Sequence, residues 1–222
     1  MTVLLWHFAK HLVCVTKYLS TSLLLVSLLF ILPIAQAAEK KILVYGDSLS
    51  AAYGIAQADG WVALLKQRLD RKSASKINLK VVNASISGET TSGGLTRISE
   101  TLKQHRPTIV IIELGANDGL QGLPVKQMQV NLRGIIEACL KAKSRVLLVG
   151  INIPPNYGPL YQASFKAIYP QLAKEFNLNF VPFLLEGIAG KPELNQEDGI
   201  HPIAKAQSRL LENVWLKLSK ML

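Results

Sequence analysis

The chain has 222 residues, 49% of them hydrophobic and 18% charged, and its formal net charge is +10 at pH 7. This length suits one well-buried domain and argues against two. The basic residues are scattered along the sequence without interleaved aromatic residues, so the positive charge indicates a solvated surface rather than a nucleic-acid-binding one.

The first 37 residues have the pattern of a secretory signal peptide. Two lysines precede an apolar core over residues 23–34, and an A-x-A cleavage site ends at Ala37. A membrane-spanning helix needs about 20 apolar residues, and Pro33 interrupts this run well short of that length. We expect export to the periplasm, cleavage near Ala37 and a single mature domain over residues 38–222. An uncleaved anchor is the alternative.

The predicted mature chain has one cysteine, Cys139, so no disulfide can form within it despite the exported context. Cys139 lies at helical spacing from Leu132, Ile135 and Ile136. This pattern indicates a buried apolar thiol rather than a catalytic one.

Strand-like and helix-like segments alternate along the mature chain. Five continuous apolar runs predict strands at residues 41–46, 78–84, 108–115, 145–151 and 179–184. Continuous apolar runs are typical of strands that are buried on both faces of a parallel sheet. Helical patterns lie at residues 61–69, 95–105, 125–143 and 161–176, and a closing helix is predicted to start at Pro202. The alternation predicts a three-layer, doubly wound α/β domain with a five-stranded parallel sheet.

Polar clusters follow four of the five predicted strands. They lie at residues 46–48, 85–88, 115–118 and 198–201. Ligands in open α/β sheets bind beyond the carboxyl ends of the strands. We therefore expect these four loops to converge on one crevice.

Ser48 follows the first strand in "GDSLS", at an expected tight turn from strand to helix. Unpaired backbone N–H groups at such a turn favour an anionic tetrahedral oxygen. A helix cap and a phosphate-binding turn are the alternatives. The chain contains neither G-x-S-x-G nor G-x-G-x-x-G, and "GIAGKP" lacks the Ser or Thr of a P-loop.

The mature chain has two histidines. His105 precedes a proline at the polar end of a predicted helix, where an exposed histidine is expected. His201 has Asp198 three residues before it, a spacing that lets the carboxylate hold one ring N–H while the other ring nitrogen accepts a proton from a serine. A loop histidine that caps the final helix is the alternative, because D-x-x-H alone is weak evidence.

A hydrolase also needs donors for the developing oxyanion. Gly88 would offer an unobstructed backbone N–H, because a missing side chain lets a ligand approach closely. Asn117 would offer its side-chain amide. Each residue also has a structural reading, Gly88 as a turn glycine and Asn117 as a loop residue that bonds its own backbone.

The blocks "GDSLS", "NASISGETT", "ELGANDGL" and "DGIHP", in this order, resemble the SGNH-hydrolase (GDSL esterase/lipase) family. The likeness spans the chain from about Lys41 to the last helix. "VVNASISGET", "PPNYG" and "AIYPQLAKEF" are similar to the bacterial periplasmic thioesterases and lysophospholipases within it. The resemblance implies a flavodoxin-like sheet and a serine esterase mechanism that needs no cofactor and no metal.

The resemblance also implies a role for each matching position. Ser48 would be the nucleophile, His201 the base and Asp198 the carboxylate that orients it. The backbone N–H groups of Ser48 and Gly88 and Nδ2 of Asn117 would form the oxyanion hole. Ala116 stands where the similar thioesterases have a second glycine, which leaves the fine substrate preference open.

The expected substrate is a small-molecule acyl ester or thioester. An apolar crevice wall suited to a fatty acyl chain is predicted from Leu120, Leu123, Ile153, Pro154 and Tyr157. Acyl-CoA is cytoplasmic, so export favours lysophospholipids or similar esters, with transient contact with membrane lipids. No nucleic acid and no obligate protein partner is expected. The alternatives are a carbohydrate acetylesterase or acyltransferase of the same family, a non-catalytic ligand-binding domain, and a phosphate or flavin binder.

Overall fold

Five parallel strands form the central sheet of the protein, for which a computed structural model describes residues 40–72 and 79–222. The predicted signal peptide lies outside the described residues. In sequence order the strands are β1 (Lys40–Gly46), β2 (Leu79–Asn83), β3 (Ile109–Glu113), β4 (Arg145–Val149) and β5 (Asn179–Val181). Their spatial order is β2-β1-β3-β4-β5, which is the flavodoxin-like order. The predicted α/β fold class is therefore confirmed.

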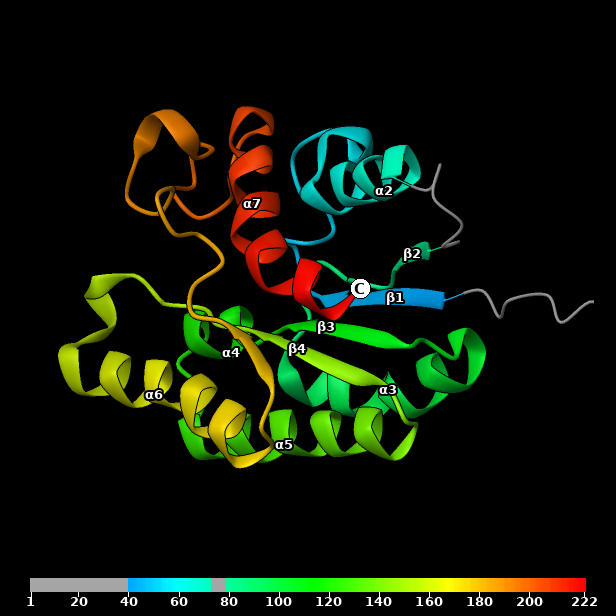
Figure 1. Ribbon diagram of the computed structural model, residues 1–222. Helices are drawn as coiled ribbons and strands as arrows, with labels where there is room; N and C mark the ends of the chain where they lie inside the picture. The colour runs from blue at the N-terminus through cyan, green and yellow to red at the C-terminus, as the bar shows by residue number, and fades with distance from the viewer. Residues whose placement is uncertain (1–39, 73–78) are drawn as a thin grey trace, which may run out of the picture. The chain divides into compact units, whose positions relative to one another are not determined.

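Helices cover both faces of the sheet, so the domain has three layers (Figure 1). One face carries α2 (Trp61–Lys72) and α7 (Gln207–Leu218), which pack against each other. The other face carries α3 (Thr91–His105), α5 (Val125–Lys141) and α6 (Pro159–Glu175). A short helix, α4 (Ala116–Leu120), follows β3, and 3₁₀ turns lie at Gln57–Asp59, Pro155–Tyr157, Pro192–Leu194, Ala204–Ala206 and Ser219–Met221. Within the described ranges, no helix is long and apolar enough to cross a bilayer.

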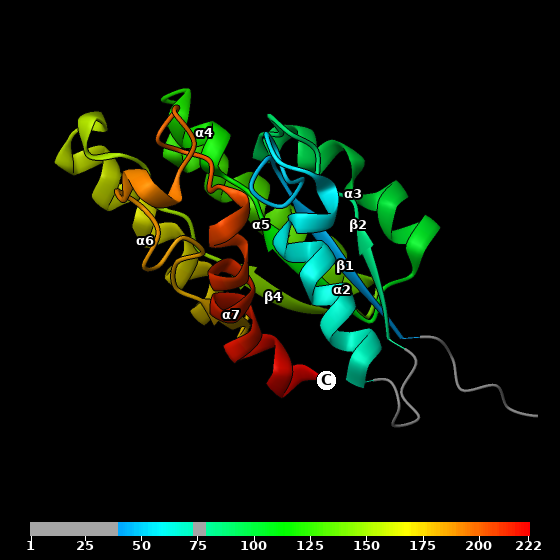
Figure 2. The ribbon, with the colours of Figure 1, turned by 90° about the horizontal axis from the view of Figure 1, so that it is seen from above.

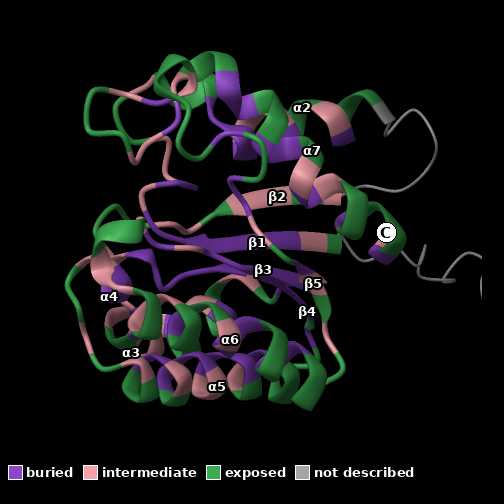
Figure 3. Cartoon of the chain, turned by 90° about the vertical axis from the view of Figure 1, so that its left-hand side faces the viewer, coloured by how far each residue is buried: buried purple, intermediate pink, exposed green. Residues whose placement is uncertain are grey.

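The core lies on both faces of the three central strands. All five residues of β3 are buried, and so are four of the five residues of β4 (Figure 3). The edge strand β2 has no buried residue, because only one neighbouring strand covers it. Continuous burial is therefore confirmed for the centre of the sheet and not for the edge strands β2 and β5. On α5, Cys139 is fully buried, and burial raises the pKa of its thiol to about 12.

The closing helix begins at Gln207, not at Pro202 as predicted. Pro202 forms an antiparallel bridge with Asn195. Backbone bonds on either side, from Gln196 N to the His201 carbonyl (2.7 Å) and from Ile203 N to the Leu194 carbonyl (3.0 Å), hold this segment extended. Because of this pairing the helix starts later than predicted, and Ile203 lies outside the helix. The other predicted core residues of the helix are buried: Leu210, Leu211, Val214 and Leu218.

All strands run in the same direction, so the loops after β1, β2 and β3 leave the sheet at the same edge. Viewed from above, the turns that follow β1 and β2 lie near α4 and the loop before α7 (Figure 2). The convergence of loops that the strand-end rule predicts is therefore present in the fold.

Candidate active site

Ser48 lies in the turn that follows β1. The backbone N–H groups of Ser50 and Ala51 donate to the Asp47 carbonyl at 3.2 and 2.9 Å, which forms one helix-like turn. Ala52 and Gly54 then adopt left-handed backbone angles, with φ of 61° and 74°, and these angles end the turn. The helix α2 then begins at Trp61, where the sequence predicts a helix.

Ser48, His201 and Asp198 form one hydrogen-bonded chain. Oγ of Ser48 lies 2.9 Å from Nε2 of His201, and Nδ1 of His201 lies 2.7 Å from Oδ2 of Asp198. Oδ1 of Asp198 accepts the backbone N–H groups of Ile200 (2.8 Å) and His201 (2.9 Å). The three-residue spacing thus allows one carboxylate to hold both the backbone and the ring of His201.

The electrostatics of this chain favour one tautomer of His201. Burial alone would raise the pKa of Asp198, but hydrogen bonds from His201 N, Ile200 N and the His201 ring lower this pKa to about 2. The ionised carboxylate holds the proton on Nδ1 and leaves Nε2 as an acceptor. The ring of Tyr53 packs against the imidazole with a centroid separation of 4.6 Å. Sequence analysis did not identify Tyr53.

Gly88 and Asn117 lie beside Ser48 and His201. All four residues line one cavity of about 220 Å³. Gly88 has a φ of +81°, in the left-handed region, and the position that a Cβ would occupy is open. Only glycine adopts this conformation without strain, and Gly88 has no side chain that would obstruct access to its N–H. The structure therefore brings together the four predicted strand-end segments.

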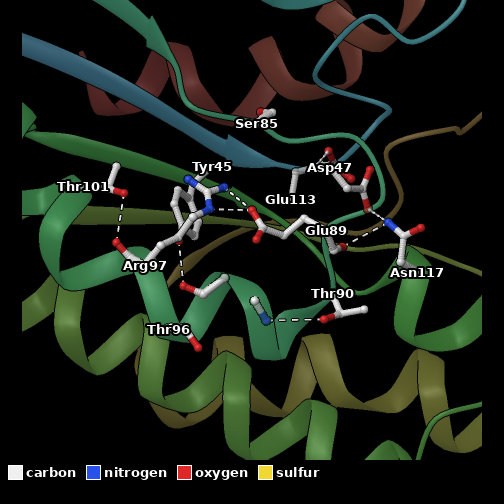
Figure 4. A network of polar contacts seen from close by, with 12 residues as sticks. Tyr45, Asp47, Ser85, Glu89, Thr90, Thr96, Arg97, Thr101, Glu113 and Asn117 are labelled. Carbon is white, nitrogen blue, oxygen red and sulfur yellow. Dashed lines mark hydrogen bonds and ion pairs between the residues drawn. The ribbon is translucent and has the colours of Figure 1, made fainter.

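Asn117 belongs to the short helix α4 rather than to a loop. Its Nδ2 donates to the Glu89 carbonyl at 3.0 Å and lies 3.4 Å from Oδ2 of Asp47 (Figure 4). The first contact is an ordinary hydrogen bond, and the second lies beyond the usual N–H···O range. One amide hydrogen is therefore well held and the other only weakly engaged.

Two buried carboxyl groups contact the turn that contains Ser48. Asp47 and Glu113 are fully buried. Oε2 of Glu113 accepts the Ser50 hydroxyl at 2.6 Å, and Oδ1 of Asp47 accepts Leu49 N at 3.1 Å. Burial raises the pKa of both carboxyl groups. Sequence analysis missed Glu113, although an acidic residue at the end of an apolar strand is a detectable signal.

A second cavity, of about 490 Å³, adjoins the first. The two cavities share lining residues Leu49, Ala116, Leu120 and Ile200. The larger cavity has a mainly apolar lining that includes three residues of the predicted wall: Leu120, Ile153 and Pro154.

The other two residues of the predicted wall do not line either cavity. The Tyr157 hydroxyl donates to the Leu120 carbonyl at 2.7 Å, and the Leu123 carbonyl accepts the Tyr161 hydroxyl at 2.7 Å. The hydroxyls of Tyr157 and Tyr161 thus hold the segment at the end of α4 and after it, and an acyl-chain contact at Leu123 and Tyr157 stays a prediction.

Two further observations bear on the chemistry of the site. His105 is the last residue of α3 and precedes β3, so it lies at the edge of the sheet opposite Ser48. Among residues 40–72 and 79–222, no group of three or more His, Cys, Asp and Glu side chains is arranged to hold a metal ion.

The chain is similar to known esterases. The GDSL-like lipase/acylhydrolase family matches residues 44–209. Esterase TesA of Pseudomonas aeruginosa is 47% identical over 187 residues, covering 84% of this chain and 92% of the relative. Thioesterase 1/protease 1/lysophospholipase L1 of Escherichia coli strain K12 is 44% identical over 179 residues, covering 81% and 83%.

A solved structure agrees with this likeness. The psychrotrophic esterase EstA from Pseudoalteromonas sp., in a crystal structure described as inhibited by monoethylphosphonate, matches with a TM-score of 0.76 and 43% identity, over 82% of this chain and 98% of that one. With its four motif blocks gathered around one pocket, the chain belongs to the GDSL-like lipase/acylhydrolase family, the SGNH hydrolases.

Proposed function

We propose that the protein is a serine esterase that hydrolyses fatty acyl esters and thioesters through an acyl-serine intermediate. The observation that carries the proposal is the hydrogen-bonded chain from Ser48 through His201 to Asp198, with contacts of 2.9 and 2.7 Å. Gly88 and Asn117 lie on the same pocket, so donors for an oxyanion are available next to the nucleophile.

In the first step, Oγ of Ser48 attacks the carbonyl carbon while Nε2 of His201 takes the hydroxyl proton. The carbonyl oxygen becomes an oxyanion, which the N–H groups of Ser48 and Gly88 and Nδ2 of Asn117 stabilise. The tetrahedral intermediate collapses, and the proton on His201 passes to the departing alcohol or thiol. An acyl-serine remains.

In the second step, His201 removes a proton from water, and the resulting hydroxide attacks the acyl carbonyl. The same donors stabilise the second oxyanion. Collapse of this intermediate breaks the bond to Oγ, returns the proton to Ser48 and releases a carboxylic acid. Asp198 stays ionised throughout and stabilises the imidazolium that forms in each step.

The apolar cavity next to Ser48 supports a fatty acyl chain as the acyl group. Its volume of about 490 Å³ lies within the range of roughly 300–1,000 Å³ that is usual for small-molecule sites. The E. coli relative is named a thioesterase and a lysophospholipase. We propose lysophospholipids and similar long-chain esters as the working substrates, with thioesterase activity as a further capability.

We also propose that the protein is exported to the periplasm, with cleavage near Ala37. The support is the signal pattern in the first 37 residues. N-terminal sequencing of the protein recovered from a periplasmic fraction tests this, and a blocked or intact Met1 would contradict it.

Labelling by a fluorophosphonate tests the catalytic proposal. We expect one label per chain, on Ser48, with labelling lost in Ser48→Ala and in His201→Ala. Each variant should lose on the order of 10⁶-fold in kcat, because residues that act as a unit fail together. Labelling of another serine, or full activity in Ser48→Ala, would overturn the assignment.

A chain-length series of nitrophenyl esters tests the acyl group. We expect kcat/KM to rise from acetyl to dodecanoyl esters, because the longer chain removes more apolar surface from water in the cavity. Similar kcat/KM values along the series would contradict the fatty acyl assignment. A strong preference for acetyl esters would favour the alternative of a carbohydrate acetylesterase.

A further inference from the structure

The side-chain amide of Asn117 depends on a residue outside the predicted active site. Its hydrogen bond to the Glu89 carbonyl measures 3.0 Å, whereas the contact with Asp47 measures 3.4 Å. The Glu89 carbonyl therefore determines how the amide is turned. The N–H that points toward Asp47 is the one available to an oxyanion, because breaking its long contact with that carboxylate costs little free energy.

Glu89 is itself held by Arg97, which projects from α3 (Figure 4). Nε of Arg97 donates to Oε2 of Glu89 at 2.5 Å, and the terminal NH2 group makes an ion pair with the same oxygen. The Glu89 and Arg97 side chains are 8% and 23% exposed. Water screens the attraction within such a pair far less than within a surface pair. The attraction therefore holds the two side chains in a defined geometry.

Arg97 is held in turn from the sheet. Its guanidinium carbon lies 4.0 Å from the centre of the Tyr45 ring, a cation–π contact. Tyr45 is fully buried in β1, and its hydroxyl donates to the Gly94 carbonyl at 2.6 Å. The rigid parts of the fold, β1 and α3, thus hold the guanidinium in place.

The loop that contains Gly88 and Glu89 has one more connection to α4. Oγ1 and N of Thr91 donate to the Asp118 carboxylate at 2.5 and 2.8 Å. Asp118 follows Asn117 directly, so the loop and the first residue of α3 contact α4 at two adjacent residues. The Thr91 contact places the helix, and the Glu89 contact turns the amide.

We propose that Glu89 and Arg97 are positioning residues for the oxyanion hole. Their ion pair holds Glu89 in place, and the Glu89 carbonyl aims one N–H of Asn117 into the catalytic pocket. This inference rests on the proposed esterase function. The ion pair takes no part in the reaction itself, but it aligns one of the three oxyanion donors.

Three variants test the proposal: Arg97→Met, Glu89→Gln and the double variant. Loss of one oxyanion donor costs about 10²–10³ in kcat, and a misaligned donor should cost less. We expect kcat to fall about 10-fold to 100-fold in Arg97→Met, with KM changed by less than about 2-fold, because the substrate is bound by the apolar cavity.

Inhibitor binding separates alignment from general damage. A boronic acid that forms a tetrahedral anion on Ser48 should bind more weakly in Arg97→Met by the same factor as the loss in kcat/KM. A free fatty acid, which forms no such anion, should bind equally well in both proteins. Equal weakening of both inhibitors would overturn the proposal in favour of a distorted pocket.

The double variant separates alignment from stability. Arg97→Met leaves a buried carboxylate without its partner, and Glu89→Gln removes that charge. We expect the double variant to recover stability to denaturant relative to Arg97→Met, while kcat stays low. Recovery of kcat together with stability would show that the pair is only structural. Arg97→Lys keeps the charge without the planar fork, so it provides a readout, again a reduced kcat, if Arg97→Met fails to fold.

Glu100→Gln is the matched control, since Glu100 pairs with Lys103 on the exposed side of the same helix. Its kcat should equal that of the wild type. A wild-type protein that labels at Ser48 and hydrolyses esters, combined with unchanged kcat in Arg97→Met, would overturn this inference alone. Absence of labelling in the wild type would overturn the proposed function instead.

Discussion

At the scale of single residues, the site depends on one carboxylate with two tasks. Asp198 uses one oxygen for the backbone of Ile200 and His201 and the other for the His201 ring. Its side chain is 38% exposed, so contact with water and these hydrogen bonds both favour the ionised form. The backbone contacts make the loop a rigid support for the imidazole.

Asp198→Asn should lower kcat by about 10⁴-fold, because an amide at this position favours the wrong imidazole tautomer. Ester hydrolysis at neutral pH measures this loss. KM should change little, since Asp198 does not line the acyl cavity. An Asp198→Asn enzyme with wild-type kcat would contradict the role of the carboxylate.

The same variant should have a pH-dependent effect on stability. The pKa of Asp198 falls from its ordinary 3.8 to about 2 in the folded protein. A carboxyl group with a lowered pKa stabilises the folded protein when the pH is above the pKa of the unfolded state. This stabilisation is lost as the pH falls through the pKa of the folded state. The difference in urea midpoint between wild type and Asp198→Asn should therefore shrink between about pH 4 and about pH 2. A constant difference would contradict this.

At the scale of elements, the turn that contains Ser48 and the loop that contains His201 must be held in fixed positions relative to each other. Gln196 joins them: its Nε2 donates to the Tyr53 carbonyl at 2.9 Å, and its backbone N–H donates to the His201 carbonyl at 2.7 Å. Gly54 allows the approach, because a Cβ at that position would lie 2.0 Å from Oε1 of Gln196. Two segments far apart in the sequence are thus tied beside the Ser48–His201 contact.

Gln196→Ala should lower kcat about 10-fold to 100-fold, because a misplacement near 1 Å can cost about 10² in rate. The thermal midpoint should change little, since the bond lies in a surface loop. Gln129→Ala removes an exposed amide pair with Gln171 between α5 and α6, and it should leave kcat unchanged. Equal kcat in both variants would show that Gln196 does not align the loops.

At the scale of the whole molecule, the sheet is a rigid platform that places the loops. Leu147 lies at the centre of β4, is fully buried, and pairs with Ile111 on one side and Asn179 on the other. The active-site segments follow from the carboxyl edge of this sheet. Leu147 itself lines neither of the two cavities, so its packing can be changed without removing a wall of the site.

Leu147→Ala should reduce the free energy of unfolding by about 2–5 kcal/mol, because it removes buried methyl groups and leaves a cavity. Leu216→Ala on α7, where the leucine is 66% exposed, should change it by no more than about 0.5 kcal/mol. Urea denaturation measures both. At temperatures where Leu147→Ala stays folded, its kcat should match the wild type, and a parallel loss of kcat would contradict this expectation.

The sequence predicted the elements that depend on local patterns. The central residues of β1, β3 and β4 (42–45, 109–112 and 146–149) are all apolar, and such runs are buried in strands that are covered on both faces. The missed features depend on contacts between distant segments. The start of α7 is delayed by the bridge between Asn195 and Pro202. The turn after Ser48 contains Ala52 in a left-handed backbone conformation, which an alanine in the sequence does not indicate.

The sequence by itself determined the α/β alternation, the family, and the residue types at the four strand ends, because periodicity and motif order are local properties. Only the tertiary structure decided which groups meet: Ser48 with His201, Glu89 with Asn117, and the catalytic pocket with the apolar cavity. These contacts join segments that lie up to 153 positions apart. Their geometry follows from the packing of β1 and α3 and from loop pairing, and no short stretch of the sequence encodes it.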